Sequence, residues 1–297
     1  MKYTLAIAHR VCPALAKTAS HYTDKFEMVK ATTDSLAAAL KGVSTHLLVI
    51  LDGCDERYEQ LFDETFGEGA VDAVDYERVS TPAIGNHPTY LKQFEWLDGQ
   101  VNEAEFLYFS EDDYIYDHDA FRQMIEFCRV KGVDFVTPLD HPDRYSHFVA
   151  ESVLSEIRVG TSRHWRTVGT SCCTFLVGRE TFKRARRQIA SYGYGASDGN
   201  LWHGLTKDAM FSFKYTIGMV VRYIFGHRGG PEHWGDFLVL TSWLYHKWRL
   251  FFYRRYRLWG PMPSLAIHLC VPSLPPFSET LLESKNFSIE ARKASIE

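Results

Sequence analysis

The sequence lacks an apolar run long enough to cross a bilayer. A membrane-spanning helix needs about 20 consecutive apolar residues. The longest candidates here, residues 217–225 and 237–244, are short, and Arg222 interrupts the first. The N-terminus has one lysine and a brief apolar stretch, without the longer apolar core and small-residue cleavage site of a secretory signal. We therefore expect residues 3–8 to form a strand and the chain to be cytoplasmic.

Paired cysteines and excess positive charge are also missing. None of the six cysteines forms a C-x-x-C pair, which argues against a zinc knuckle and suits reduced thiols. A net charge of -4 favours no nucleic-acid partner. The chain also shows no internal repeat and no glycine-rich loop for a triphosphate. What is present, 297 residues with 45% hydrophobic and 24% charged side chains, is typical of a globular protein.

Strand-like and helix-like segments alternate in the first half of the chain. Strands are expected at 3–8, 46–51, 71–79, 106–110 and 135–137, and helices at 14–41, 56–66, 87–101 and 120–131. This alternation predicts an α/β fold, with a mostly parallel, Rossmann-like sheet flanked by helices. Later segments are less regular, with strands expected at 170–177 and 265–267, a basic helix at 180–190, and a helical C-terminal extension. Ligands of such sheets bind beyond the carboxyl ends of the strands.

Three consecutive carboxylates, Glu111-Asp112-Asp113, follow the apolar run 106–109. In a part-buried site they would repel one another, so a positive charge is expected nearby, and a divalent cation is the simplest one. Carboxylate oxygens suit magnesium or manganese, and both ions bridge readily to phosphate oxygens. The alternative is an acidic loop that only caps the next helix through Asp117 or Asp119.

These segments resemble glycosyltransferases of the GT-A fold, especially the large family 2 group. The resemblance is carried by the loop 8–10 (Ala-His-Arg), the strand end 50–53 (Ile-Leu-Asp-Gly), Gly85-Asn86, and 108–114, which looks like the family's D-x-D element in an E-D-D form. Residues 263–268 and the Leu-Pro-Pro at 274–276 resemble a late strand of some members, in which a histidine completes the metal site. The match covers residues 1–200 and 263–277, and it departs from the family at Glu111, where aspartate is usual.

The resemblance implies transfer of a sugar from a nucleoside diphosphate donor to a saccharide or lipid-linked acceptor, with inversion. It also implies that Asp113 and His268 bind Mn²⁺ or Mg²⁺, and an imidazole ligand favours manganese. Asp112 would act through the ribose or through water, and Glu111 would orient the site or face the sugar. By default, however, a single histidine such as His268 in an apolar strand is a core residue.

The same resemblance implies that His9, Arg10 and Asp52 bind the nucleotide base and ribose. Each also has a plainer interpretation. Asp52 precedes a glycine and could be a turn residue, while His9 and Arg10 could belong to a solvated loop.

An inverting transfer also needs a base that takes the proton of the acceptor hydroxyl. Family 2 enzymes carry an acidic residue at a helix start well after the D-x-D element, and Asp198 is the best match. Alternatively, Ser197 or Asp198 only caps the helix that begins near Leu201. Asp140 and Asp236 are the rival bases.

Residues 243–259 combine aromatic and basic side chains. At helical spacing, one face carries aromatic residues and the opposite side carries lysine and arginine. Such a helix packs its aromatic face on the core, lies on an anionic membrane surface, or lines a lipid-phosphate acceptor site. A location at the inner face of the membrane is therefore a further expectation.

We divide the chain into a nucleotide-sugar-binding half at 1–120, an acceptor-binding half at 121–277 that is fused to it, and a polar tail at 278–297. Two rivals to the glycosyltransferase stay open. A nucleotidyltransferase also arranges carboxylates and a cation on such a sheet, but it would release pyrophosphate. A non-catalytic saccharide-binding or scaffold protein would bind without turnover.

Overall fold

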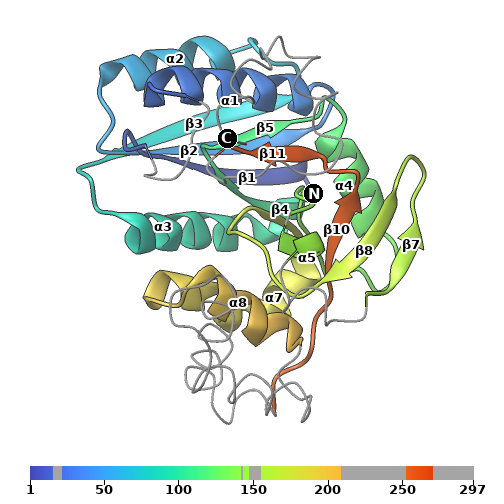
Figure 1. The fold of residues 1–297 in the computed structure, drawn as a ribbon. Helices are drawn as coiled ribbons and strands as arrows, with labels where there is room; N and C mark the ends of the chain where they lie inside the picture. The colour runs from blue at the N-terminus through green and yellow to red at the C-terminus, as the bar shows by residue number, and fades with distance from the viewer. Residues whose placement is uncertain (16–21, 142, 147–154, 209–251, 270–297) are drawn as a thin grey trace, which may run out of the picture.

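The computed structural model describes residues 1–15, 22–141, 143–146, 155–208 and 252–269. Within them, a nine-stranded sheet runs in the order β3-β2-β1-β4-β9-β6-β10-β8-β7 (Figure 1). Its strands are β1 (Tyr3–Val11), β2 (Thr45–Asp52), β3 (Val74–Thr81), β4 (Ala104–Glu111), β6 (Phe135–Val136), β7 (Ile157–Val159), β8 (His164–Val168), β9 (Phe175–Gly178) and β10 (Leu258–Met262). A separate pair consists of β5 (Tyr114–Tyr116) and β11 (Ala266–His268).

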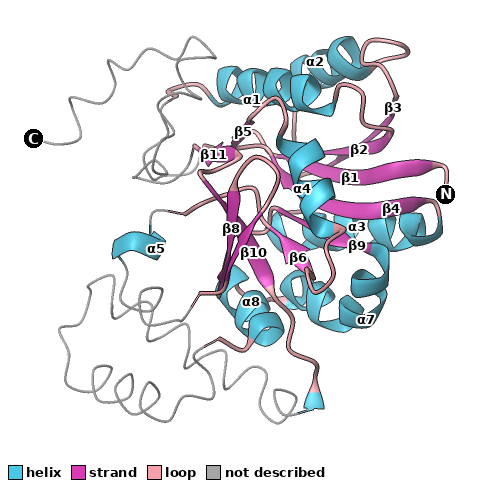
Figure 2. Cartoon of the chain, turned by 90° about the vertical axis from the view of Figure 1, so that its right-hand side faces the viewer, coloured by secondary structure: helices cyan, strands magenta, loops and turns pink. Residues whose placement is uncertain are grey.

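Helices cover both faces of the sheet. They are α1 (Lys25–Leu40), α2 (Glu56–Phe66), α3 (Asn86–Gly99), α4 (Ala120–Cys128), α5 (Asp143–Ser146), α7 (Arg179–Ile189) and α8 (Asp198–Thr206), with short 3-10 turns η1 (Gln100–Asn102) and η2 (Ala190–Tyr194). Helices α1 and α2 lie on one face and α3 on the other, and Figure 2 shows α7 and α8 on the side of α3. The predicted α/β sheet flanked by helices is confirmed.

The first half of the sheet is parallel. Strands β3, β2, β1 and β4 are parallel neighbours, and the chain returns between them through helices. Because Arg10 pairs with Glu111 in register, β1 and β4 end at the same edge. The interiors of β1 and β2 are buried on both faces, as expected for strands of a covered parallel sheet. The strands expected at 3–8, 46–51 and 106–110 are confirmed.

Helix α1 begins later than the predicted helix at 14–41. Its N-cap is Asp24, whose carboxylate accepts hydrogen bonds from the backbone N–H groups of Phe26 (2.7 Å) and Glu27 (3.3 Å). A side-chain acceptor at this position satisfies N–H groups that have no partner within the helix, so it fixes where the helix starts. Lys25 therefore stands in the first turn, at the carboxyl edge of the sheet.

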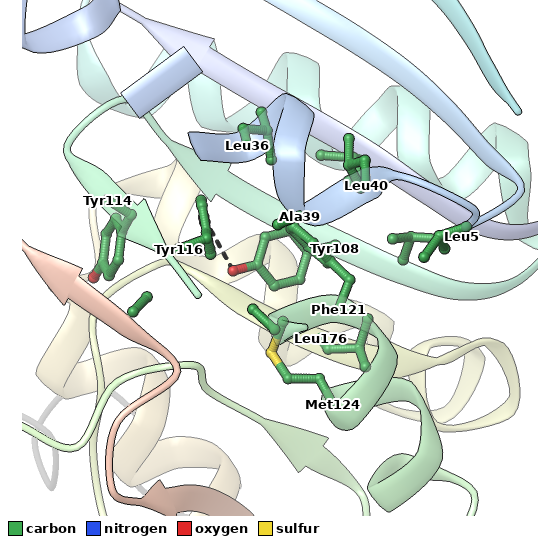
Figure 3. Packing of buried hydrophobic residues seen from close by; sticks show 14 of the residues in the cluster. Leu5, Leu36, Ala39, Leu40, Tyr108, Tyr114, Tyr116, Phe121, Met124 and Leu176 are labelled. Carbon is green, nitrogen blue, oxygen red and sulfur yellow. Dashed lines mark hydrogen bonds between the residues drawn. The ribbon is translucent and has the colours of Figure 1, made fainter. Parts of the chain in front are cut away.

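The core between α1, α4 and the sheet is aromatic. Figure 3 shows Tyr108 of β4 against Tyr116 of β5, with Phe121 and Met124 of α4 and Leu36 of α1 around them. All five side chains are fully buried, and the hydroxyl of Tyr108 donates to that of Tyr116 over 3.1 Å. This packing fixes β5, and with it the residues directly after β4.

The second half of the sheet is mixed. Strand β9 is antiparallel to both β4 and β6, and β10 is parallel to β6 but antiparallel to β8. The strand predicted at 170–177 is wrong at its start, because only Phe175–Gly178 pairs with neighbours on both sides. Strands β7, β8 and β10 were not predicted, since their partners lie far away in the sequence.

The helix predicted at 243–259 is wrong from residue 253 onward, while 243–251 lie outside the described residues. Trp259 is fully buried in β10, where it pairs with Val136 of β6 and Thr167 of β8. These ladder bonds satisfy the backbone that a helix would have satisfied internally. Tyr256 is buried as well, whereas Phe252 is 77% exposed, so only part of the predicted aromatic face packs on the core.

The arginines of the same segment lie at the surface, each beside a carboxylate. Their ion pairs are Arg254–Asp134, Arg255–Asp208 and Arg257–Glu156. In the part of the chain that the structure describes, no helix is both long and apolar enough to cross a membrane.

Candidate functional site

The carboxyl ends of β1 and β4 bring the acidic motif against the loop that follows β1. Glu111 is the last residue of β4, and Asp112 and Asp113 form the tight connection to β5. Each of the three carboxylates has a different cationic partner. The repulsion expected from three adjacent negative charges is therefore relieved by side chains from distant parts of the sequence.

Glu111 is paired with Arg10 across the register of β1 and β4. The guanidinium Nη2 of Arg10 donates to Oε1 of Glu111 over 2.6 Å, and Oε2 accepts from the hydroxyl of Thr174 over 3.1 Å. Burial opposes the charge of Arg10, but Glu111 outweighs it and raises the pKa of Arg10. The rings of Tyr90 and Tyr192 flank the guanidinium at 5.9 and 5.8 Å. Arg10 is therefore a fixed, buried cation and not part of a solvated loop.

Asp112 is buried beside Lys25. Its Oδ1 accepts from Nζ of Lys25 over 2.8 Å, and its Oδ2 accepts from the backbone N–H of Cys12 over 2.9 Å. Burial raises the pKa of Asp112 against the pull of Lys25. Burial alone would lower the pKa of Lys25. The charge of Asp112 and its hydrogen bond with Lys25 act in the opposite direction, and the pKa of Lys25 is raised overall. The pair ties the start of α1 and the end of β1 to the acidic motif.

Asp113 meets His268, which lies 155 residues later in the chain. Strand β11 pairs with β5, and this register places Nε2 of His268 2.9 Å from Oδ2 of Asp113. The imidazole stacks on the ring of Tyr114, with centroids 4.7 Å apart and planes at 8°. Burial opposes protonation, but Asp113 and Cys172 together outweigh it and raise the pKa of His268 well above 6.5. The two predicted metal ligands are thus brought together, as an ion pair.

His9 and Asp52 are built into the walls of the site. His9 is buried, its Nδ1 lies 2.8 Å from the hydroxyl oxygen of Ser110, and burial lowers its pKa to about 3, so its imidazole is neutral. Asp52 accepts from the Thr81 hydroxyl (2.7 Å) and from the backbone N–H groups of Ile84 (2.6 Å) and Gly85 (2.8 Å). His9 is therefore no solvated loop residue, and Asp52 fixes the loop that leads into α3. Contact of either residue with a nucleotide stays a prediction.

Asp198 is the first residue of α8 and has one exposed side. Ser197 is the N-cap and accepts from the N–H of Asn200 over 3.1 Å, so Asp198 itself is not needed as the cap. Desolvation by the surrounding protein raises the pKa of Asp198, and the charge of Glu111 adds to the rise, whereas His268 opposes it. Its role as the base stays a prediction.

The rival base Asp140 is fully engaged. It is buried, its Oδ1 accepts from Nη2 of Arg166 over 2.9 Å, and its Oδ2 accepts from the hydroxyl of Tyr145 over 2.5 Å. Arg144 lies 3.7 Å away. Both oxygens of Asp140 are therefore occupied by partners within the protein. The other rival, Asp236, lies outside the described residues.

Two residues of the site were not predicted. No sequence pattern marks Lys25, because its partner lies 87 residues away. Cys172 places its Sγ 3.9 Å from Nδ1 of His268, on the side opposite Asp113. The apolar surroundings of Cys172 in the sequence indicated only a buried thiol.

No protein-family model matches the chain, and no curated protein does either. The solved structures that it resembles include the galactosyltransferase LgtC in complex with donor and acceptor sugar analogues, with 10% identity, a TM-score of 0.41, and coverage of 98% of this chain and 100% of that chain. Another is the bifunctional glycosyltransferase WbbM, with 11% identity, a TM-score of 0.39, and coverage of 65% and 34%.

A third resemblance is to 4-diphosphocytidyl-2C-methyl-D-erythritol synthase from Anaerococcus prevotii, with 12% identity, a TM-score of 0.37, and coverage of 68% of this chain and 82% of that chain. TM-scores below 0.5 do not establish a common fold. The function therefore has to be inferred from the topology and side chains of this chain.

Proposed function

We propose that the protein is a metal-dependent glycosyltransferase of the GT-A type, which transfers a sugar from a nucleoside diphosphate donor with inversion. One observation carries the proposal: Asp113 and His268, 155 residues apart, meet at 2.9 Å where the parallel strands end. This edge is where ligands of such sheets bind. A carboxylate and an imidazole from a late strand are also what the resemblance to family 2 implies for the metal site.

The carboxylate of Asp113 and the imidazole of His268 are suitable ligands for Mn²⁺ or Mg²⁺, but two side chains do not fill the coordination sphere of the ion. Among the described residues, no group of three or more histidine, cysteine, aspartate or glutamate side chains is arranged to hold a metal ion. Two protein ligands would leave coordination positions for diphosphate oxygens and water, which is common for magnesium sites beside phosphates. When bound, the ion would offset the negative charge of the departing diphosphate.

Other residues of the chain supply binding and proton transfer. Arg10 and Lys25 are cations held at the carboxyl edge by Glu111 and Asp112, and they keep that edge from being purely acidic. Asp198 takes the proton of the acceptor hydroxyl. A raised pKa suits this role, because a carboxylate is a better base when its pKa is closer to neutral pH.

The acceptor is a saccharide or a lipid-linked saccharide. A cytoplasmic location, with contact to the inner face of a membrane through 243–259, belongs to the same proposal. The exposed Arg254, Arg255 and Arg257 support the membrane contact, and residues 243–251 lie outside the described residues.

A thermal-shift screen tests the function. Nucleoside diphosphates and nucleotide sugars are added to the full chain, with and without manganese, and the products of positive pairs are analysed. We expect stabilisation that requires manganese and turnover that releases a nucleoside diphosphate. Release of pyrophosphate from a nucleoside triphosphate would identify a nucleotidyltransferase instead. Binding of a saccharide without turnover of any donor would identify a binding protein.

A further inference from the structure

Beside the Asp113–His268 pair lies a second charged cluster, which the donor chemistry does not use. It consists of Asp140, Arg144, Tyr145 and Arg166, from the segment after β6, from α5 and from β8. Asp140 is 1% exposed, and the side chains of Arg144 and Arg166 are 7% and 14% exposed. Three charged groups are therefore largely withdrawn from water at one place.

Among the described side chains, the cluster carries one positive charge in excess, because Arg144 and Arg166 both face the one carboxylate of Asp140. Within the part of the chain that the structure describes, the buried Nε of Arg166 has no hydrogen-bond partner. Its guanidinium lies under the ring of Tyr145, 4.4 Å from the centroid. Burial lowers the pKa of Arg144 to about 10; Asp140 opposes this shift and Arg166 adds to it. A buried cation without full compensation is costly and is stabilised by an anion.

The chain makes room for this arrangement. A Cβ atom at Gly260 of β10 would lie 2.5 Å from Nη1 of Arg144, so a side chain there would displace the guanidinium. Arg144 instead donates to the carbonyl oxygens of Leu139 (2.8 Å) and Thr170 (3.3 Å). The glycine thus provides the space in which the guanidinium is held.

Short contacts connect the cluster to the candidate catalytic residues. Thr170, which accepts from Arg144, stands two residues before Cys172, whose Sγ is 3.9 Å from Nδ1 of His268. On the other side, the backbone N–H of Asp140 donates to the hydroxyl of Ser264 over 3.0 Å, just before β11. Hydrogen bonds thus tie the cluster to the two segments that carry Cys172 and His268.

We propose that Arg144 and Arg166 form a subsite for an anionic group, a carboxylate or a phosphate ester, on the acceptor. The inference rests on the proposed function, since it specifies the acceptor of that same site. Guanidinium groups suit it because their N–H donors match the oxygen spacing of both groups. Tyr145, which is 48% exposed, covers Arg166 in the unliganded protein, and its ring has to move aside for the anion.

Calorimetric titration of the full chain tests the subsite without requiring the donor to be known. The probes are methyl glucuronide, glucose 6-phosphate and the neutral methyl glucoside, each with and without uridine diphosphate and manganese. We expect at least one charged sugar to bind about tenfold more tightly than the neutral one. The sugar that is preferred shows whether the anion is a carboxylate or a phosphate ester.

The variants are Arg166→Gln, Arg166→Lys and, as a matched control, Arg129→Gln, which removes an exposed arginine paired with Glu105. Arg166→Lys keeps a positive charge beside Asp140, so the chain should still fold if Arg166→Gln does not. Both Arg166 variants should lose most of the preference for the charged sugar, and the control should keep it. Equal binding of charged and neutral sugars by the unmodified protein, or a preference that survives both Arg166 variants, would overturn the subsite.

Uridine diphosphate binding is followed in the same titrations. An anion preference that depends on Arg166 in a protein that binds no nucleotide would leave the anion site standing and remove its assignment to a transfer acceptor. Nucleotide binding without an anion preference would leave the proposed function standing and remove the anion subsite. The two proposals can therefore fail separately.

Discussion

The two halves of the sheet differ in the direction of their strands and in how the strands are connected. In β3-β2-β1-β4, neighbouring strands are parallel and are linked by helices, and their ends carry Asp52, Arg10 and Glu111. In the other half, antiparallel pairs dominate and partners are separated by long stretches of sequence, as in the pairing of β10 with β6 and β8. The first half supplies a carboxylate-rich wall and the second an arginine-rich one. A site that joins a donor to an acceptor can draw on both.

We expect the largest effect from removing the proposed base, Asp198, which lies in the second half of the chain. In Asp198→Asn the side chain keeps its size but cannot take up a proton, and Ser197 still caps α8. Transfer should fall by about two or more orders of magnitude. Donor binding should stay near normal, because the residues proposed to hold the donor lie in the first half. Initial rates with a labelled donor measure the effect, and transfer at the original rate would show that the base lies elsewhere.

The buried pair Lys25–Asp112 is the corresponding weak point of the first half. Lys25→Met leaves a buried carboxylate without its cation, and we expect a loss of about 3 kcal/mol in the free energy of unfolding. Urea denaturation measures this. The double variant Lys25→Met/Asp112→Asn should recover most of the loss, and the exposed Lys2→Met should change little. Equal effects of Lys25→Met and Lys2→Met would show that the buried pair is not important for stability.

His9 and His268 should make the stability of the protein depend on pH in opposite directions. Folding lowers the pKa of His9 to about 3, so between pH 6.5 and 3 the unfolded chain binds the extra proton and stability falls as the pH falls. The slope from this residue is at most about 1.4 kcal/mol per pH unit. Folding raises the pKa of His268, so its contribution is complete below pH 6.5 and is lost as the pH rises through the raised value.

Urea titrations across pH therefore distinguish the halves. His9→Asn should flatten the acid side of the stability profile, and His268→Asn the alkaline side. Profiles that change on the same side in both variants would contradict the opposite charge states assigned to the two rings.

The smallest effect is expected at the arginines before β10. Replacing Arg254, Arg255 and Arg257 by glutamine removes exposed ion pairs, each of which contributes less than about 1 kcal/mol. The urea midpoint should barely change, whereas sedimentation with anionic vesicles should show weaker association if this face meets a membrane. Unchanged sedimentation would remove membrane contact from the proposal.

The sequence predicted the first half of the fold well because its signals are local. The strand of residues 46–51 is a continuous apolar run ending at Asp52, and such a run bounded by polar residues is nearly independent of its surroundings. Strand β10 shows the opposite. Its Leu-Trp-Gly-Pro-Met sequence contains both a glycine and a proline, and only β6 and β8, which are distant in sequence, make it a strand.

The site divides in the same way. The acidic motif and the late strand with His268 could be found in the sequence, because the resemblance to family 2 pointed to both, whereas the role of Asp198 stays a prediction. Lys25, Cys172 and Arg166 could not, because their partners lie 87, 96 and 26 residues away and no pattern couples them. The error in the predicted helix at 243–259, which the structure shows from residue 253 onward, has a related cause, since aromatic and basic residues at helical spacing look alike whether they pack on a helix or beside a strand.

The central claim is that Asp113 and His268 share one cation with the donor diphosphate. Electron spin-echo spectroscopy of Mn²⁺ bound with a nucleoside diphosphate tests it, because a coordinated imidazole nitrogen modulates the echo. We predict a directly bound nitrogen in the unmodified protein, its loss in His268→Gln with the nucleotide still bound, and loss of the bound manganese itself in Asp113→Asn. Manganese that binds with nucleotide and shows no protein nitrogen, or one that persists in His268→Gln, would contradict this site.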